Sequence, residues 1–339
     1  MEHLGYVQID TIHVIERCHH QILYTRIPGY RRDDLRQAQA IDKTVFEYWT
    51  HALSYVPTRD LRFFVRAMKQ DWQARSAWFG AVKKADLRRV LARIRKHGAL
   101  TIRDIDDDVL VDKDHEWASR KPSKRALQLA FYQGVLTVSQ RTGMLKTYEL
   151  MNRHFGWERL PKPASEREIL DYLLERALRS QGVVSVDSAC FADARRKPAM
   201  RRLIEARVRR KELVAVEFEG GHWVRPETLE ARLEPGEERV HILSPFDPLV
   251  HQRKRLHLFF GYEHRFEAYV PKDKRRFGYF AQPVLVGDEI VALVDLKTDR
   301  ARQKLLLQQW TWVAKRSRRL HKPRIEEALH RFERFQLAR

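Results

Sequence analysis

The apolar and polar positions of the first eighty residues alternate between helical and extended spacing. Apolar side chains between Thr11 and Tyr24 recur every three or four residues, which predicts a helix, and Asp33-Asp34 can cap a second, shorter one. The run from Val45 to Trp49 is rich in aromatic and branched residues and predicts a strand. In order, the predicted elements are helices 11–24 and 33–40, strands 45–49 and 53–56, and helices between 60 and 80.

The next two regions share one plan, and this internal likeness is the strongest indication of the fold. In the first region the elements are a helix 85–97, extended residues 100–102 with an acidic segment, a helix 122–133, and hairpin strands 135–138 and 145–150. In the second they are a helix 165–181, extended residues 183–185, a short helix near 190, a helix 198–210, and strands 213–218 and 222–224. This order is typical of a winged helix, whose third helix usually approaches a nucleic-acid groove.

The pattern changes after a charged linker at 227–242. A stiff turn at Leu243 to Leu249 is followed by a basic helix near 252–260 and then by several short strands. The predicted strands are 266–270, 277–280, 284–286, 290–295 and 304–312, and an amphipathic helix 324–337 follows them. Strands at this spacing suggest a small antiparallel barrel or curled sheet. The predicted fold class is therefore α+β, mainly α, with tandem winged-helix units and a C-terminal small antiparallel β-barrel.

Charge changes the picture more than any other property of the composition. Among 339 residues, 65 are Lys or Arg and 45 are Asp or Glu, which leaves a net charge of +20. Such an excess favours a polyanionic partner such as nucleic acid, and the alternative is a generally basic soluble protein. The two cysteines, Cys18 and Cys190, exclude a disulfide framework or a cysteine-based zinc finger, and Cys18-His19-His20 lacks spaced partner ligands. Without a membrane-length apolar run or a signal-peptide pattern, we expect a cytoplasmic, nucleoid-associated protein.

The apolar run from Leu4 to Ile12 holds an amide and a carboxylate two residues apart, Gln8 and Asp10. If the run is extended, these two side chains point to the same side, while Val7 and Ile9 anchor the other face. The alternative is that Asp10 caps the helix that follows it.

Basic residues gather at positions where they can meet phosphates. In the first repeat the candidates, with one amide among them, are Lys124, Arg125, Gln128, Arg141 and Lys146. In the second repeat, Arg195, Arg196, Lys197, Arg201 and Arg202 lie near the start of the third helix. In the C-terminal region the candidates are Lys274, Arg275, Arg276, Lys297 and Arg300. The alternatives are solvated cationic faces and a solubilising rim.

Several motifs together resemble one known family. They are Leu4 to Ile12, Glu47-Tyr48-Trp49-Thr50-His51, Leu243 to Leu249, Tyr269-Val270-Pro271, Lys274 to Tyr279, and Val294-Asp295-Leu296-Lys297. In this order, and over nearly the whole chain, they resemble the bacterial winged-helix DNA glycosylases of the AlkZ and YcaQ (AlkX) type. The resemblance implies tandem winged helices in a C-shaped arrangement with a C-terminal β-barrel, and excision of alkylated guanine.

The motif Gln8-Ile9-Asp10 resembles the Gln-x-Asp form of the YcaQ-like branch, which implies activity on N7-alkylguanine and unhooking of interstrand crosslinks. The implied domains are an incomplete first winged-helix region with the catalytic motif (1–84), second and third winged helices (85–160 and 161–226), a linker (227–242) and a barrel with a terminal helix (243–339). Two departures stand out: an N-terminal helical segment ahead of the motif is expected but missing, and Ala292-Leu293 replaces the usual Gly-Arg.

The chemistry of N7-alkylguanine suits this pair of side chains. The cationic base leaves readily, so a carboxylate beside the sugar, assigned to Asp10, has to stabilise an oxocarbenium-like centre and take a proton from water. Gln8 would orient that water. Trp49 and His51 either line an open cleft or pack at a strand end, and Asp247 is expected to form a turn. The predicted partner is double-stranded DNA carrying alkylated guanine, with no cofactor, metal, membrane or obligate protein partner.

The alternative function is a non-catalytic winged-helix DNA-binding protein such as a transcriptional regulator. A regulator would prefer one duplex sequence steeply, whereas a glycosylase would leave abasic sites in 7-methylguanine DNA of any sequence. No lysine lies beside Gln8 and Asp10 in the sequence to serve as a Schiff-base nucleophile, which favours a monofunctional glycosylase.

Overall fold

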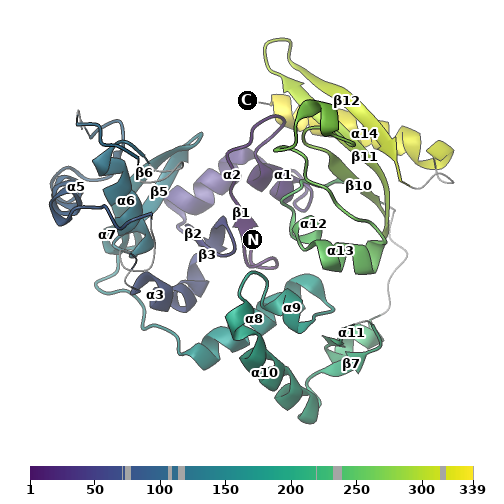
Figure 1. Ribbon diagram of the computed structural model, residues 1–339, viewed down its shortest axis with the longest axis horizontal. Helices are drawn as coiled ribbons and strands as arrows, with labels where there is room; N and C mark the ends of the chain where they lie inside the picture. Colours follow the sequence, from purple (N-terminus) through teal and green to yellow (C-terminus); the bar gives the residue numbers. More distant parts are fainter. Residues whose placement is uncertain are drawn as a thin grey trace. The chain divides into compact units, whose positions relative to one another are not determined.

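The chain folds into two compact units, each built from separate stretches of sequence. The computed structural model describes residues 1–70, 72, 78–105, 109–113, 119–218, 220–231, 239–313 and 318–338. The first unit comprises Met1–Tyr6 and Arg31–Leu173, and the second comprises Val7–Tyr30 and Leu174–Arg339 (Figure 1). The residues around Gln8 and Asp10 therefore fold with the C-terminal half of the chain. Within these described ranges, no helix has the length and apolar character needed to cross a membrane.

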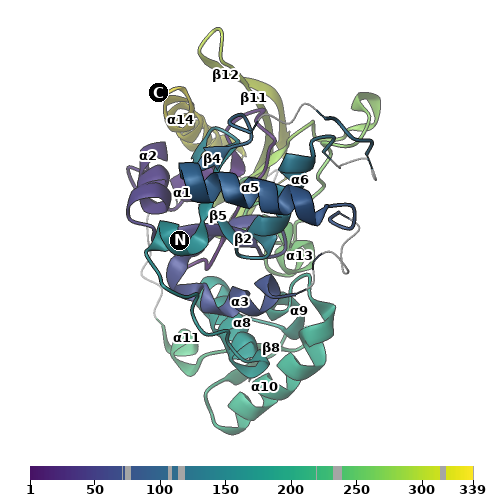
Figure 2. The same ribbon diagram turned by 90° about the vertical axis from the view of Figure 1, so that its left-hand side faces the viewer.

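The first unit surrounds a core of aromatic and aliphatic side chains. Its elements are α2 (Arg32–Arg36), the π-helical turn η1 (Gln37–Ile41), β2 (Val45–Trp49), β3 (Leu53–Pro57), α3 (Arg62–Met68), α5 (Lys84–His97), β4 (Leu100–Thr101), α6 (Pro122–Tyr132), β5 (Leu136–Thr142), β6 (Leu145–Leu150) and α7 (Met151–Phe155). Phe46 of β2, Ile94 of α5 and Phe131 of α6 are all at most 2 % exposed and belong to one cluster. Helix α5 packs against α6 (Figure 2).

The predicted internal repeat has a counterpart in the strand order. In the first repeat β4 pairs with β6, which pairs with β5, so the first strand lies beside the third. The second repeat contains α8 (Glu166–Gln181), α9 (Val186–Ala189), α10 (Lys197–Arg209), β7 (Val214–Val216) and β8 (His222–Val224). Here Val184 forms a bridge to Trp223 of β8, which pairs with β7. In both repeats the first extended residues therefore lie beside the last strand, although α9 of the second repeat has no counterpart among the described residues of the first.

The C-terminal part of the second unit is an antiparallel sheet covered by helices. It contains β9 (Val240–Ile242), α12 (Pro248–His251), α13 (Arg253–Phe260), η4 (Lys272–Lys274), β10 (Gln282–Val286), β11 (Glu289–Asp299), β12 (Lys304–Trp312) and α14 (Arg318–Leu337). The strand order is β12-β11-β10-β9, and α14 packs on β11 and β12 (Figure 1). In the part of the chain that is described, β9 and β12 are edge strands, so closure into a barrel is not confirmed.

Two of the predicted strands, 266–270 and 277–280, are wrong. Neither stretch forms a strand; the backbone there consists of turns and irregular segments. The amides that a strand would use are bound by two buried carboxylates. Glu267 accepts from Arg276 N and Phe277 N at 3.1 and 2.7 Å. Asp295 of β11 accepts from Tyr279 N and Phe280 N at 2.9 and 3.0 Å. Side-chain acceptors thus replace the neighbouring strand, which a local pattern cannot reveal.

The predicted helix 11–24 is also shorter than expected. Helix α1 spans Cys18–Tyr24, and residues 11–17 form no regular structure. Ile15 is only 1 % exposed, and it packs into the core of the C-terminal sheet with residues such as Val294 and Phe332. Its apolar periodicity therefore reflects burial in an irregular segment rather than a helical face.

Candidate active site

Residues 7–9 are firmly buried ahead of Asp10. Val7 and Gln8 form the short strand β1 (Val7–Gln8), and Val7, Gln8 and Ile9 are 0, 8 and 5 % exposed. The Sγ atom of Cys18 in α1 donates to the carbonyl oxygen of Gln8 at 3.1 Å. Burial and the nearby Asp10 carboxylate raise the pKa of the Cys18 thiol, so this cysteine stays protonated and serves as a donor rather than a nucleophile.

Asp10 is half-buried, and its carboxylate closes a tight turn. Its Oδ1 atom accepts a hydrogen bond from Ile12 N at 2.8 Å. Burial raises the pKa of Asp10, while the Ile12 and Thr11 amides and the Arg17 guanidinium act against that rise. Asp10 does not cap a helix directly, because α1 begins only at Cys18. A carboxyl group with a raised pKa and one oxygen bound to the backbone is a suitable general base.

The segment after Asp10 is held by the end of β11. Thr298 N donates to Val14 O at 2.9 Å, and Arg300 Nη2 donates to the carbonyl oxygens of His13 and Ile15 at 3.2 and 2.7 Å. Arg300 is exposed, and its Nη2 atom serves these two carbonyl oxygens, while its expected contact with DNA stays a prediction.

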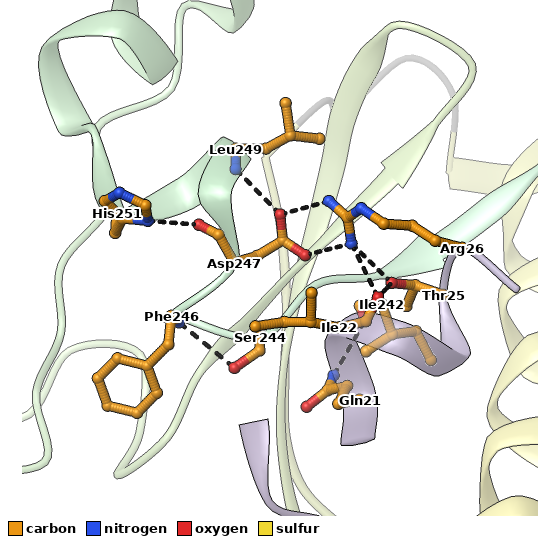
Figure 3. Close-up of polar contacts among 10 residues, drawn as sticks. All are labelled: Gln21, Ile22, Thr25, Arg26, Ile242, Ser244, Phe246, Asp247, Leu249 and His251. Carbon is orange, nitrogen blue, oxygen red and sulfur yellow. Dashed lines mark hydrogen bonds and ion pairs between the residues drawn. The ribbon is translucent and has the colours of Figure 1, made fainter. Parts of the chain in front are cut away.

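Helix α1 is joined to the C-terminal sheet by buried polar contacts (Figure 3). Gln21, which is fully buried, donates to Ile242 O at 2.9 Å and accepts from Gln282 Nε2 at 3.0 Å. Arg26 forms a two-pronged ion pair with Asp247, both N–O distances being 2.7 Å. The sequence gives no local signal for Arg26, because its partner lies 221 residues away.

Asp247 has the turn-forming role expected from the sequence. It is fully buried, and its Oδ1 accepts from Leu249 N at 2.9 Å, which caps α12. The same carboxylate binds Arg26, so both of its oxygens are occupied. It has no exposed oxygen with which to act on a substrate.

A basic loop, defined here as residues 272–280, presents cations on a fixed backbone. Glu267 and Asp295 bind four of its amides, as described above. Lys274 and Arg276 are exposed, and Arg276 lies over the ring of Phe277 at 4.9 Å. Arg275 is half-buried; it donates to Val270 O at 2.8 Å and lies over the ring of Tyr279 at 4.8 Å. The loop therefore offers three exposed cations, Lys272, Lys274 and Arg276, and one that supports its shape.

Two further side chains of the second unit, Lys297 of β11 and Tyr269, are exposed. Tyr269 is 82 % exposed, which is unusual for a large aromatic residue. In the sequence, Tyr269 stands out only as part of the motif Tyr269-Val270-Pro271. Its position next to a run of cations was the available signal, because exposed aromatic rings beside cations suit nucleic-acid bases. Arg201 and Arg202 of α10 are exposed, while Arg196 just before α10 and Lys197 at its start pair with Asp193 and Asp187 at 2.6 and 2.8 Å.

The basic candidates of the first unit divide into exposed and internal residues. Lys124 of α6 is exposed and Gln128 is half-buried. Arg125 is 5 % exposed and donates to Asp112 O at 2.9 Å. Arg141, whose side chain is also 5 % exposed, pairs with the fully buried Glu47, with Nη2 2.6 Å from Oε2. The donors of Arg125 and Arg141 serve internal acceptors, so these two residues are not among those proposed to contact phosphates.

Lys146, Trp49 and His51 each lie against an aromatic ring. Lys146 Nζ lies over the ring of Phe131 at 5.1 Å, and burial lowers its pKa to about 8. Trp49 is 45 % exposed at the end of β2, with its ring centroid 6.2 Å from that of Tyr132. His51 meets the ring of Tyr6 edge-on at 5.3 Å. The proposed cleft-lining role of Trp49 and His51 stays a prediction.

The histidines that follow Cys18 contact aromatic groups. The rings of His19 and His20 lie 4.4 Å apart, and His20 Nδ1 is 2.7 Å from the hydroxyl of Tyr30. Among the residues with described positions, no three His, Cys, Asp or Glu side chains come together in a way that could hold a metal ion.

Comparison with known proteins gives one consistent result. The family described as "DNA glycosylase AlkZ-like" matches residues 1–335. Among solved structures, the chain is similar to Streptomyces sahachiroi DNA glycosylase AlkZ, with a TM-score of 0.56 and 18 % identity over 90 % of this chain and 82 % of that chain. At this identity the likeness concerns the fold, with its helices and antiparallel sheets. Because the family match spans nearly every residue, the chain belongs to the AlkZ-like family of DNA glycosylases.

Proposed function

We propose that this protein is a monofunctional DNA glycosylase that hydrolyses the N-glycosidic bond of N7-alkylated guanine and also unhooks interstrand crosslinks formed there. The observation that carries the proposal is the Asp10 carboxyl group, which is half-buried, has a raised pKa and is held at Oδ1 by Ile12 N. Asp10 stabilises the sugar as it becomes oxocarbenium-like and accepts a proton from the attacking water. Gln8 orients that water.

The substrate supplies most of the leaving-group activation in this proposal. Alkylation at N7 makes the guanine cationic, so its departure needs little help from a general acid. The electron pair of the glycosidic bond leaves with the base, and water adds to the sugar carbon while its proton passes to Asp10. The products are a free alkylated base and an abasic site. A crosslinked guanine stays tethered to the opposite strand, so the same chemistry has to proceed without full extrusion of the base.

We further propose that both repeats are winged helices and that DNA binding is spread over both units. The shared strand order, in which the first extended residues lie beside the third strand, supports the winged-helix assignment. Lys274, Arg276 and Lys297 contact phosphates in the second unit, and Lys124 and Gln128 do so in the first. Tyr269 stacks on an exposed base. Phosphate contacts without sequence readout suit an enzyme that meets lesions in any context.

The decisive experiment compares wild-type protein with Asp10→Asn on 7-methylguanine DNA. Asparagine keeps an oxygen that accepts from Ile12 N, so the turn is preserved while the negative charge is lost. We expect the rate of 7-methylguanine release under single-turnover conditions to fall by about 10²–10⁴-fold. The matched control is Asp104→Asn, since Asp104 likewise accepts from a backbone amide, that of Thr101 at 2.7 Å, and it should retain the wild-type rate.

The pH dependence gives a second readout of the same residue. Because burial raises the pKa of Asp10, the wild-type rate should fall as the pH drops through that raised value, and Asp10→Asn should lack this acidic limb. Absence of free 7-methylguanine with the wild-type protein would defeat the glycosylase proposal. Unchanged release by Asp10→Asn would leave the activity in place and remove the role of Asp10.

A further inference from the structure

Three successive carbonyl groups shortly after Asp10 are all bound by one short stretch of β11 and the turn that follows it. The acceptors are the carbonyl oxygens of His13, Val14 and Ile15. Val14 O is bound by Thr298 N, and the other two are bound by a single guanidinium nitrogen of Arg300, Nη2. One planar group that serves two carbonyls two residues apart fixes the bend of the backbone between them.

The donors of these bonds are themselves held in place. Thr298 is 6 % exposed, and its hydroxyl donates to Gln336 of α14. The turn after β11 is closed by Arg302 N donating to Asp299 Oδ1 at 3.0 Å and by Gln303 Nε2 donating to Arg300 O at 2.7 Å. Across the turn, Leu305 N of β12 donates to Glu333 of α14 at 2.8 Å. The β11–β12 turn and α14 therefore form a rigid support for residues 13–15.

Asp10 lies between this support and a second fixed point. Ahead of it, Gln8 O accepts from the buried Sγ of Cys18, and Val7 and Ile9 are buried. Behind it, Ile12 N binds the carboxylate itself, one residue before His13. A shift of residues 13–15 would therefore move Ile12 N and rotate the carboxyl group that depends on it.

We propose that Arg300 is a positioning residue for Asp10 and that it acts through the His13 and Ile15 carbonyls rather than through DNA phosphates. This proposal rests on the glycosylase function proposed above. The two possible roles of Arg300 have different effects. A phosphate contact changes the affinity for DNA and its salt dependence, whereas a positioning residue changes the reaction rate after binding.

The test compares Arg300→Ala, Arg300→Lys and the control Arg302→Ala. Arg302 lies in the same turn with a side chain that is 81 % exposed, so its removal takes away the same charge without touching residues 13–15. Three quantities are measured for each protein: single-turnover release of 7-methylguanine, the Kd for lesion-containing DNA at two salt concentrations, and hydrogen exchange of the backbone between residues 10 and 17. Thermal unfolding confirms that each variant is folded.

We expect Arg300→Ala to lower the single-turnover rate on the order of 10- to 100-fold, as a small misplacement of a catalytic group does, with unchanged Kd and salt dependence. Exchange between residues 10 and 17 should accelerate. Arg300→Lys keeps the charge but not the planar donor, so it should stay slow and exchange quickly. Arg302→Ala should match the wild type in rate and exchange.

Opposite results would overturn the proposal. Weaker binding with a shallower salt dependence in Arg300→Ala, restored by Arg300→Lys and accompanied by wild-type exchange, would identify Arg300 as a phosphate contact. If the wild type and Arg302→Ala both release no base, the glycosylase proposal fails. The exchange measurement would still decide whether Arg300 holds residues 10–17.

Discussion

Three acidic side chains of the second unit differ in what their oxygens bind. Asp295 is 7 % exposed and accepts from two successive amides, Tyr279 N and Phe280 N. Asp247 is fully buried and binds both Arg26 and Leu249 N. Asp10 is half-buried, with Oδ1 bound to Ile12 N. Both oxygens of Asp295 and of Asp247 bind protein groups, so these two carboxylates stabilise the fold. Asp10, in contrast, is partly exposed to solvent.

The Asp295 carboxylate can bind the amides of Tyr279 and Phe280 only because residue 278 is a glycine. Its φ is +116°, and a Cβ atom there would lie 2.2 Å from Asp295 Oδ2. Gly278→Ala should therefore displace the carboxylate from the basic loop and lower the free energy of unfolding by about 2–3 kcal/mol, measured by urea denaturation.

The control is Gly261→Ala, because Gly261 also has a positive φ of +59° but no atom within 4 Å of the added Cβ. It should lose only about 1 kcal/mol of unfolding free energy, the cost of a left-handed conformation. Equal losses in the two variants would show that Asp295 yields without cost and that it does not hold the loop.

At the scale of elements, α1 depends on its partners rather than on its own sequence. It has seven residues, no side-chain cap and no acidic residue in its first turn. A helix this short is unstable alone, so tertiary contacts have to hold it. Three contacts do so: the side chain of Ile22 is buried, Gln21 forms hydrogen bonds to Ile242 of β9 and Gln282 of β10, and Arg26 pairs with Asp247 (Figure 3).

Removing Arg26 should be costly because it leaves a buried carboxylate without its partner. Arg26→Met is expected to lower the free energy of unfolding by about 3–5 kcal/mol. Arg26→Met combined with Asp247→Asn should recover part of that loss, since the amide keeps the Leu249 N–H bond without a charge. As a control, Arg36→Met breaks an exposed pair with Asp33 and should cost less than about 1 kcal/mol. Chemical denaturation of the three proteins measures these differences, and a double variant no more stable than Arg26→Met would contradict the ion-pair explanation.

Elements with strong local signals could be predicted from the sequence. Strands 45–49 and 304–312 match β2 and β12, and a helix opened by proline at 122 matches α6. The wrong predictions, a helix over residues 11–17 and strands at 266–270 and 277–280, have one physical cause. Residues 13–15 are held by the distant Arg300, and residues 276–280 are held by the side chains of Glu267 and Asp295, contacts that a local pattern does not reveal. For the same reason the local pattern does not reveal the groups that hold Gln8 and Asp10, or the internal acceptors of Arg125 and Arg141. The catalytic role of Gln8 and Asp10 stays a prediction.

At the scale of the whole molecule, the net charge of +20 and the family membership agree on a polyanionic substrate. The positions of the cations say more about their roles than the net charge does. Arginines at internal positions, such as Arg26 and Arg141, neutralise buried carboxylates. Arg276 of the basic loop is exposed, and it is one of the residues proposed to contact phosphates.

Synthesis on the ribosome proceeds in the order of the sequence, so the beginning of the second unit is made long before its end. Ile15 and Arg300 are separated by 285 residues, which take roughly 15–60 s to translate at ~5–20 residues per second. Until then the nascent segment from Val7 to Tyr30 lacks the sheet that buries it. In ribosome-stalled chains, proteases should cleave between residues 10 and 30 until residues 298–336 have left the exit tunnel, and earlier protection would point to a different partner. If Asp10 has the role proposed for it, base excision begins only after the last strand and the last helix have been made.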